Sequence, residues 1–108
     1  MWAPGEFKGR VAVVTGGSEG IGYDICRALC EVGCEVHFCA RNALRGQAAA
    51  ESLGARAHYF QTDLTAPEQI LAFASHVSQV AGRVDYLVNN ALARIPQRRP
   101  RTGELDAP

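Results

Sequence analysis

The chain has 108 residues, of which 47% are hydrophobic and 20% are charged, a composition typical of one small globular domain. Its eleven basic and eleven acidic residues cancel, so net charge gives no reason to expect binding to nucleic acid or to an anionic membrane. No apolar run approaches the about 20 residues of a membrane span, and residues 1–10 lack the apolar region of a signal peptide, so we expect a cytoplasmic protein.

The predicted secondary structure alternates strands and helices. A near-continuous apolar run at residues 10–15 predicts a first strand that is buried on both faces. A glycine-rich turn follows it, and then a helix whose apolar positions are Ile21, Ile25, Ala28, Leu29 and Val32. Further strands are predicted at 35–39, 57–61 and 84–89, and further helices at 43–53 and 67–81. This β-α-β-α-β-α-β order predicts an α/β fold with a parallel sheet.

Two further patterns concern the last helix and the cysteines. Pro67 suits the first turn of the helix at 67–81, and we expect Thr65 to cap it. Three cysteines recur every four residues, which places them along one helix face, and the fourth follows in a strand. They include no Cys-x-x-Cys pair, so buried free thiols are favoured over a zinc site or disulfides. These cysteines are Cys26, Cys30, Cys34 and Cys39.

The character of the sequence changes after Ala91. Residues 92–108 hold four of the ten arginines and three of the five prolines and show no apolar periodicity. We therefore predict a folded domain at residues 1–91 and an irregular tail rich in Pro and Arg at 92–108. The arginines of the tail could contact nucleic acid, but a solvated tail is favoured.

The most informative segment runs from Thr15 to Gly22, between the first strand and its helix. Glycine allows a tight turn and close approach to a phosphate, and a helix N-terminus favours an anion. A dinucleotide pyrophosphate fits this context, and Ser18 is favoured as a phosphate contact over a nucleophile because no His/Asp arrangement accompanies it. The predicted contacts in this turn are Gly16, Ser18, Glu19, Gly20, Ile21 and Gly22.

The glycine spacing resembles that of the short-chain dehydrogenase/reductase family, whose first turn reads T-G-x-x-x-G-x-G. Three further landmarks agree in order and spacing, and together they extend the resemblance over roughly residues 7 to 91, with most similarity to carbonyl and 3-oxoacyl reductases. They are Cys39-Ala40-Arg41-Asn42, Asp63-Leu64 and Asn89-Asn90-Ala91. The resemblance implies a partial Rossmann-type sheet of about four strands in the order 3-2-1-4, with the helix at 67–81 alone on one face.

The resemblance also assigns a nicotinamide dinucleotide and the residues that hold it. Arg41 would lie near its ribose, Asp63 and Leu64 would lie near its adenine, and the remaining contacts would be Asn42, Asn89, Asn90 and Ala91. An NAD-selective site usually has a carboxylate after the second strand, whereas a guanidinium can bind a 2′-phosphate bidentately. Arg41 therefore favours NADP(H) over NAD(H).

Against this preference, Glu19 stands where NADP-preferring relatives often carry Lys or Arg, and Arg41 could instead be a solvated loop residue. Asp63 could also be a helix cap, and the two asparagines could be loop formers.

The catalytic residues of the family are missing. Its members use a Tyr-x-x-x-Lys pair on a helix, in which the cation lowers the pKa of the phenol. The one lysine here is Lys8, and no tyrosine has a lysine four residues later. Leu92 also replaces the family's glycine, which suggests a frameshift, an alternative last exon or a truncated gene model. Reading the transcript past the Ala91 codon in all three frames would test that hypothesis.

These observations leave three functional hypotheses. The first is an NADP(H)-binding portion of an oxidoreductase that turns nothing over as it stands. The second is a non-catalytic interaction or regulatory form that pairs with an intact relative through the exposed edge of the fourth strand. The third is a nonfunctional product that folds poorly.

Overall fold

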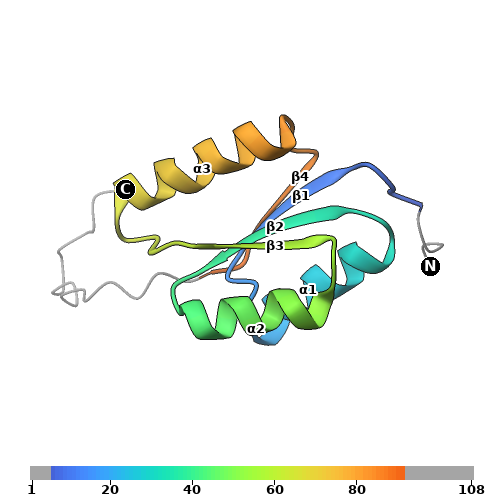
Figure 1. Ribbon diagram of the computed structural model, residues 1–108, viewed down its shortest axis with the longest axis horizontal. Helices are drawn as coiled ribbons and strands as arrows, with labels where there is room; N and C mark the ends of the chain where they lie inside the picture. Colours follow the sequence, from blue (N-terminus) through green and yellow to red (C-terminus); the bar gives the residue numbers. More distant parts are fainter. Residues whose placement is uncertain (1–5, 92–108) are drawn as a thin grey trace, which may run out of the picture.

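Four parallel strands form one sheet in the computed structural model, which describes residues 6–91 (Figure 1). The order in the sheet is β3-β2-β1-β4, as predicted. The strands are β1 (Val11–Thr15), β2 (Glu35–Ala40), β3 (Ala57–Gln61) and β4 (Tyr86–Asn89), and the helices are α1 (Gly20–Glu31), α2 (Ala43–Leu53) and α3 (Pro67–Ala81). The predicted tail at residues 92–108 lies outside the described residues.

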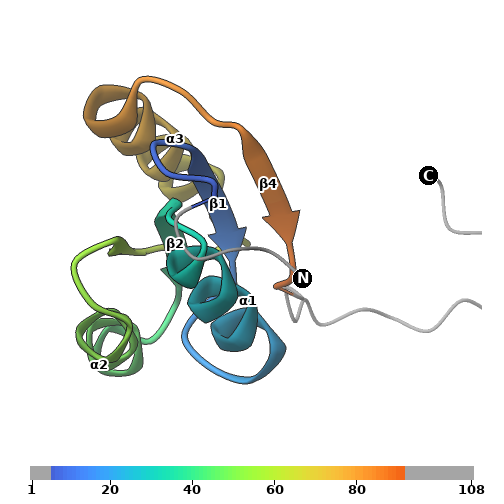
Figure 2. The ribbon, with the colours of Figure 1, turned by 90° about the vertical axis from the view of Figure 1, so that its right-hand side faces the viewer.

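The three helices form two layers on the sheet, with α1 and α2 on one face and α3 on the other (Figure 2). Successive strand residues point to opposite faces, so Val14 and Phe38 pack under α1 and α2 while Val13 and Cys39 pack under α3. Both faces of β1 and β2 are therefore covered, which explains their near-continuous apolar sequences. None of the described helices is long and apolar enough to cross a membrane.

The face of α1 that packs on the sheet agrees only in part with the predicted one, because Ile25, Leu29 and Val32 pack against the core whereas Ile21 and Ala28 are exposed. Ile21 is 73% exposed, whereas Gly22, Cys26 and Cys30 are the buried residues of this helix. A Cβ built on Gly17, in the turn after β1, would lie 2.7 Å from Phe38 of β2 and 2.8 Å from Cys26 Sγ of α1, so the space between α1 and the sheet holds no larger side chain there. The prediction of an Ile21 core contact was wrong because small residues permit the closer approach.

The prediction of buried free thiols is confirmed for all four cysteines. Burial raises the pKa of Cys26 to about 12 and that of Cys30 to about 11. Because the thiolate is the reactive form, these side chains act as small apolar core residues at neutral pH.

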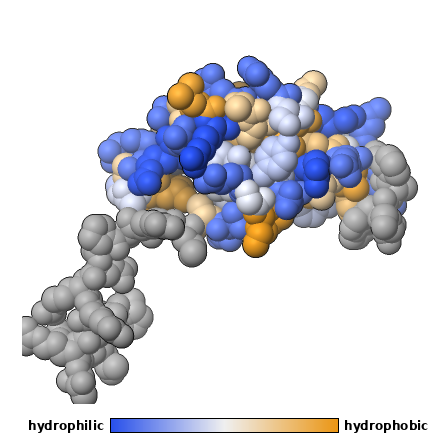
Figure 3. Space-filling view, turned by 90° about the horizontal axis from the view of Figure 1, so that it is seen from below, coloured by the Kyte–Doolittle hydropathy of each residue, from blue (hydrophilic) through white to orange (hydrophobic). Residues whose placement is uncertain are grey.

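The outer surface of the α1 and α2 layer is mostly hydrophilic, with hydrophobic residues in small separate patches (Figure 3).

The start of α3 also differs from the prediction. Ala66 is its N-cap residue, and no side chain caps the helix. Thr65 lies one residue before the N-cap position, and its hydroxyl donates to Asp63 Oδ1 at 2.7 Å instead of accepting from a helix amide. Phe73 and Val77 are the residues through which α3 is buried against the sheet.

The sheet ends at β4, which pairs with β1 alone among the described strands. Leu87 on this strand is 62% exposed, and Leu71 and Val80 of α3 are 70% and 60% exposed. Leu87 is in register with Val13, so it points to the face that carries α3. Apolar side chains therefore remain exposed on that helix and on the strand at the end of the sheet.

Candidate functional site

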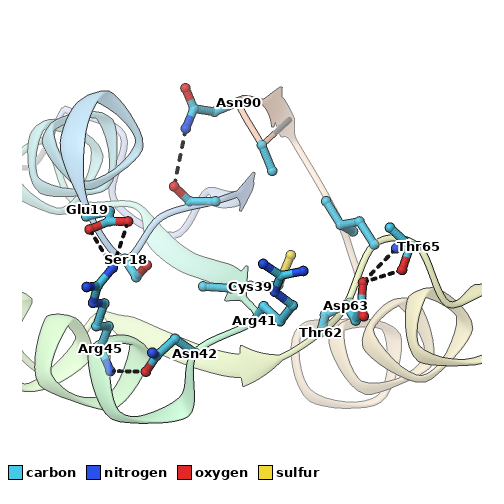
Figure 4. Close-up of a pocket in the computed structure, with 14 residues that line it drawn as sticks. Ser18, Glu19, Cys39, Arg41, Asn42, Arg45, Thr62, Asp63, Thr65 and Asn90 are labelled. Atoms are coloured by element: carbon cyan, nitrogen blue, oxygen red, sulfur yellow. Dashed lines mark hydrogen bonds and ion pairs between the residues drawn. The ribbon is translucent and has the colours of Figure 1, made fainter. Parts of the chain in front are cut away.

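A cleft of about 690 Å³ lies at the carboxyl edge of the sheet (Figure 4). The strand ends are level there because Thr15 pairs with both Cys39 and Asn89. In open parallel sheets this edge is where ligands bind, and the volume suits a small-molecule ligand. The cleft is lined by Gly16, Ser18, Glu19, Cys39, Ala40, Arg41, Asn42, Arg45, Thr62, Asp63, Leu64, Thr65, Asn90 and Ala91.

Most of the residues predicted from the sequence meet in this cleft. Those that line it are Gly16, Ser18, Glu19, Arg41, Asn42, Asp63, Leu64, Asn90 and Ala91. The predicted residues outside its lining are Gly20, Ile21, Gly22 and Asn89. Their contact with a nucleotide stays a prediction, and so does that of the nine lining residues.

The turn after β1 is fixed by backbone contacts. The amides of Gly16 and Gly17 donate to the carbonyl of Cys39 at 2.8 and 3.4 Å, which ties the turn to the end of β2. A Cβ on Gly22 would lie 2.0 Å from the carbonyl oxygen of Gly16, so only glycine lets α1 begin this close to the turn. Glu19 is the N-cap residue of α1, but its side chain makes no capping hydrogen bond. The geometry therefore presents a helix N-terminus, which favours an anion, beside the cleft.

The residues after β4 are bound to the same turn. Thr15 Oγ1 accepts hydrogen bonds from the amides of Asn90 and Ala91 at 3.0 and 3.1 Å. The Asn90 side chain donates from Nδ2 to the carbonyl of Gly16 at 3.2 Å. Asn90 thus holds the glycine turn against β4, a structural role beyond that of a loop former.

The segment from the end of β2 into the first turn of α2 carries two basic residues toward the cleft. Tyr59 donates from its hydroxyl to the carbonyl of Ala40 at 2.8 Å, and Gln61 donates to the carbonyl of Arg41 at 3.1 Å. Asn42 caps α2 by accepting from the amide of Arg45 at 3.0 Å. These bonds fix the backbone from which Arg41 and Arg45 extend.

Arg45 is the charged lining residue that the sequence did not predict; the other unpredicted lining residues are Cys39, Ala40, Thr62 and Thr65. Its Nη1 lies 3.1 Å from Glu19 Oε2 and 3.2 Å from Glu19 Oε1, so α2 and the glycine turn are joined by an ion pair (Figure 4). A signal existed in the sequence, because an arginine in the first turn of a helix opposes the helix dipole and suggests a partner elsewhere.

Asp63 stands after β3, on the other side of Arg41 from Asn42 (Figure 4). Its Oδ1 accepts from the hydroxyl and from the amide of Thr65, at 2.7 and 2.9 Å. These bonds, with a smaller contribution from Arg41, hold the pKa of Asp63 below its ordinary value. The carboxylate is therefore ionised at neutral pH, and it closes a turn before α3 instead of capping the helix.

The sheet order, the glycine turn and the cleft at the carboxyl edge define a Rossmann-type α/β fold. A sequence model described as short chain dehydrogenase matches residues 10–106, and the chain belongs to this family. The match continues past Ala91, where the sequence motifs had ended, into residues outside the described range. The family binds nicotinamide dinucleotides, which agrees with the position of the cleft.

Curated relatives and a solved structure support the same assignment. The chain is 35% identical to L-fucose dehydrogenase of Bos taurus over 95 residues, covering 88% of this chain and 35% of the relative. It is 36% identical to peroxisomal 2,4-dienoyl-CoA reductase of Danio rerio, covering 84% and 32%. Menthone neomenthol reductase from Mentha piperita has a TM-score of 0.73 at 36% identity, covering 76% and 31%. The chain therefore spans about a third of the length of these proteins.

Proposed function

We propose that this chain binds NADP(H) in preference to NAD(H) in the cleft at the carboxyl edge of the sheet, as the nucleotide-binding portion of an oxidoreductase. The observation that carries the proposal is the end of β2, where Ala40 and Arg41 line the cleft. An NAD-selective site has a carboxylate at this point to accept a hydrogen bond from the ribose 2′-hydroxyl. An arginine there is suited to a 2′-phosphate instead.

The guanidinium of Arg41 is available for such a ligand. Within residues 6–91 it makes no hydrogen bond, while the backbone beneath it is held by Gln61. A guanidinium can form two parallel charge-assisted bonds with a phosphate, each stronger than a bond between neutral groups. The bound backbone and the free side chain together form an anion site that needs little rearrangement.

We also propose that the chain by itself reduces no carbonyl substrate. The support is chemical, because proton transfer in this family uses a tyrosine whose pKa is lowered by a lysine on the same helix face. The sequence holds one lysine, Lys8, which precedes β1. Incubation with NADPH and a panel of ketones and aldehydes should leave the absorbance of the reduced nicotinamide constant, and steady oxidation would contradict the proposal.

Calorimetric titration of the 108-residue chain with NADP⁺ and NAD⁺ tests the cofactor preference. We expect NADP⁺ to bind at least about tenfold more tightly, since a hydrogen bond to a charged group contributes about 1.5–3 kcal/mol. Arg41→Ala should remove that difference and leave NAD⁺ affinity within about twofold, because Arg41 faces the group that only NADP⁺ carries. Arg27→Ala is the matched control, since Arg27 is an exposed cation on α1 outside the cleft. Equal affinity of wild-type protein for the two nucleotides would refute the preference.

A second function, pairing with an intact relative, is favoured by the exposed Leu87 on the end strand β4. The backbone groups of an end strand can template another strand. Co-elution of the chain with a full-length short-chain dehydrogenase should then be lost in Leu87→Lys and kept in Leu44→Lys, a variant of an equally apolar residue that is 85% exposed on α2. No co-elution of the wild-type chain would rule this function out for the relative used.

A further inference from the structure

Two residues of the cleft give opposite indications about the cofactor. Arg41 provides a cation for a 2′-phosphate, while Glu19 places a carboxylate in the glycine turn, where it would repel the same group. The structure joins Glu19 to a third residue, Arg45. Both carboxylate oxygens of Glu19 lie within 3.2 Å of Nη1 of Arg45, and all three residues line the one cleft (Figure 4).

The position of Arg45 has no explanation within its own helix. It lies in the first turn of α2, which begins at Ala43, and a cation there opposes the helix dipole. The turn contains no acidic residue, and the amide of Arg45 is already used by the Asn42 cap. The interaction that accounts for an arginine at this position is the one with Glu19 across the cleft.

The ion pair contributes little to the stability of the fold. The side chains of Arg45 and Glu19 are 63% and 69% exposed, so water screens their attraction and the pair stabilises the fold weakly at most. Its effect on a ligand is different, because pairing cancels the charge of Glu19 at the place where an anion would bind. In addition, Nε and Nη2 of Arg45 donate to no other side chain or backbone group in the described part of the chain.

We propose that Arg45 determines cofactor selectivity by neutralising Glu19, so that Glu19 does not oppose the action of the Arg41 cation on the 2′-phosphate. This inference rests on the proposed function, the binding of NADP(H) in this cleft. An unpaired carboxylate in the same cleft repels a phosphate of charge near −2, and we expect this repulsion to weaken binding on the order of tenfold. NAD⁺ lacks this phosphate and is affected much less. Arg45 is thus a positioning residue that acts through Glu19.

The test is a double-mutant cycle read as the ratio of NADP⁺ to NAD⁺ affinity, at low ionic strength, with the full 108-residue chain. Arg45→Gln should lower the ratio about tenfold because it leaves Glu19 unpaired. The double variant Glu19→Gln/Arg45→Gln should restore the ratio to within about threefold of wild type. Added salt should shrink the difference between Arg45→Gln and wild type, since exposed charges are screened.

A matched pair of control variants is available on α1. Asp24 and Arg27 form an ion pair at 3.7 Å whose side chains are 67% and 60% exposed, outside the cleft. Arg27→Gln removes the same charge from a similarly exposed pair, so it should leave the ratio unchanged. Melting of each variant without ligand should stay within about 8 °C of wild type, because exposed pairs add little stability.

The possible results separate the inference from the proposed function. If wild-type protein binds neither nucleotide, or binds them equally, the proposed function fails and the inference falls with it. If wild type prefers NADP⁺ but Arg45→Gln leaves the ratio unchanged, the inference alone is overturned. A double variant that stays as weak as Arg45→Gln would overturn it as well, because Arg45 would then act on the ligand independently of Glu19.

Discussion

The close contact between α1 and the glycine turn makes Gly22→Ala a sharp test of the site geometry. In an exposed helix this substitution would stabilise the fold by about 1 kcal/mol, through the better helix propensity of alanine. Here the new Cβ would lie 2.0 Å from the carbonyl oxygen of Gly16 and 2.6 Å from Nδ2 of Asn90. The first of these atoms belongs to the backbone, so relief requires the turn itself to move.

The steric clash of the new Cβ lowers the free energy of unfolding, whereas the better helix propensity of alanine raises it. Overpacking of this kind costs about 1–3 kcal/mol, and loss of the hydrogen bond from Asn90 to Gly16 costs a further 0.5–1.5 kcal/mol, roughly. The clash exceeds the propensity gain, and we expect a net loss of about 1–3 kcal/mol. For a domain of this size, the midpoint of thermal unfolding should fall by roughly 5–20 °C.

The assay is thermal unfolding followed by circular dichroism, with NADPH titration on the folded variant. Gly20→Ala is the control, since no atom lies within 4 Å of its built Cβ although its φ is +62°. That variant suffers backbone strain of about 1–2 kcal/mol without a clash. Gly22→Ala should therefore weaken NADPH binding more than Gly20→Ala does when both are folded. A Gly22→Ala protein with wild-type stability and affinity would refute the close approach of α1.

Three further predictions concern the sheet. His37 is 3% exposed, and burial, together with nearby His58 and His76, lowers its pKa. The free energy of unfolding should therefore fall as the pH drops below about 6.5, the ordinary pKa of histidine. His37→Phe should flatten that fall in thermal melts recorded at a series of pH values. Asp85 accepts hydrogen bonds from Arg83 and from the amide of Val11, and these bonds lower its pKa. The stability that the Asp85 carboxylate contributes should therefore be lost as the pH falls below about 3.9, the ordinary pKa of aspartate. Asp85→Asn should remove this acid-dependent loss of stability from the same melts. Tyr59→Phe should lower the free energy of unfolding by about 0.5–1.5 kcal/mol in urea, because the hydroxyl bond to Ala40 is lost, and no change would contradict that bond.

Much of the fold could be predicted because periodicity and turn residues agree along the chain. Predicted and observed elements differ by two residues or fewer at their ends, the largest difference being the start of β4 at Tyr86. The errors arose at positions where tertiary contacts, and not the periodicity of the sequence, determine burial and capping. Ile21 falls on an apolar helical stripe, yet the close approach through Gly22 and Cys26 turns it outward. Thr65 has the right residue type for a cap, but α3 begins one residue later than a Thr65 cap requires, with Ala66 at the N-cap position.

The candidate site could be predicted as far as its motifs extend. The glycine turn, the end of β2 and the end of β4 meet at one edge because parallel strands end level. Arg45 could not be found from a motif, because its partner lies 26 residues away and the pairing depends on how α2 is placed against the turn. Such long-range pairs require the fold to be known first.

Binding of NADP(H) in the cleft in preference to NAD(H) can be measured by thermal melts of the 108-residue chain without ligand, with NADPH and with NADH. A ligand that binds only the folded state adds about 2.7 kcal/mol at a hundredfold excess over its dissociation constant. The account predicts a cooperative melt that NADPH shifts upward by roughly 10–20 °C at that excess, and a clearly smaller shift with NADH at the same concentration. A melt that neither nucleotide moves, or that both move equally, would contradict it.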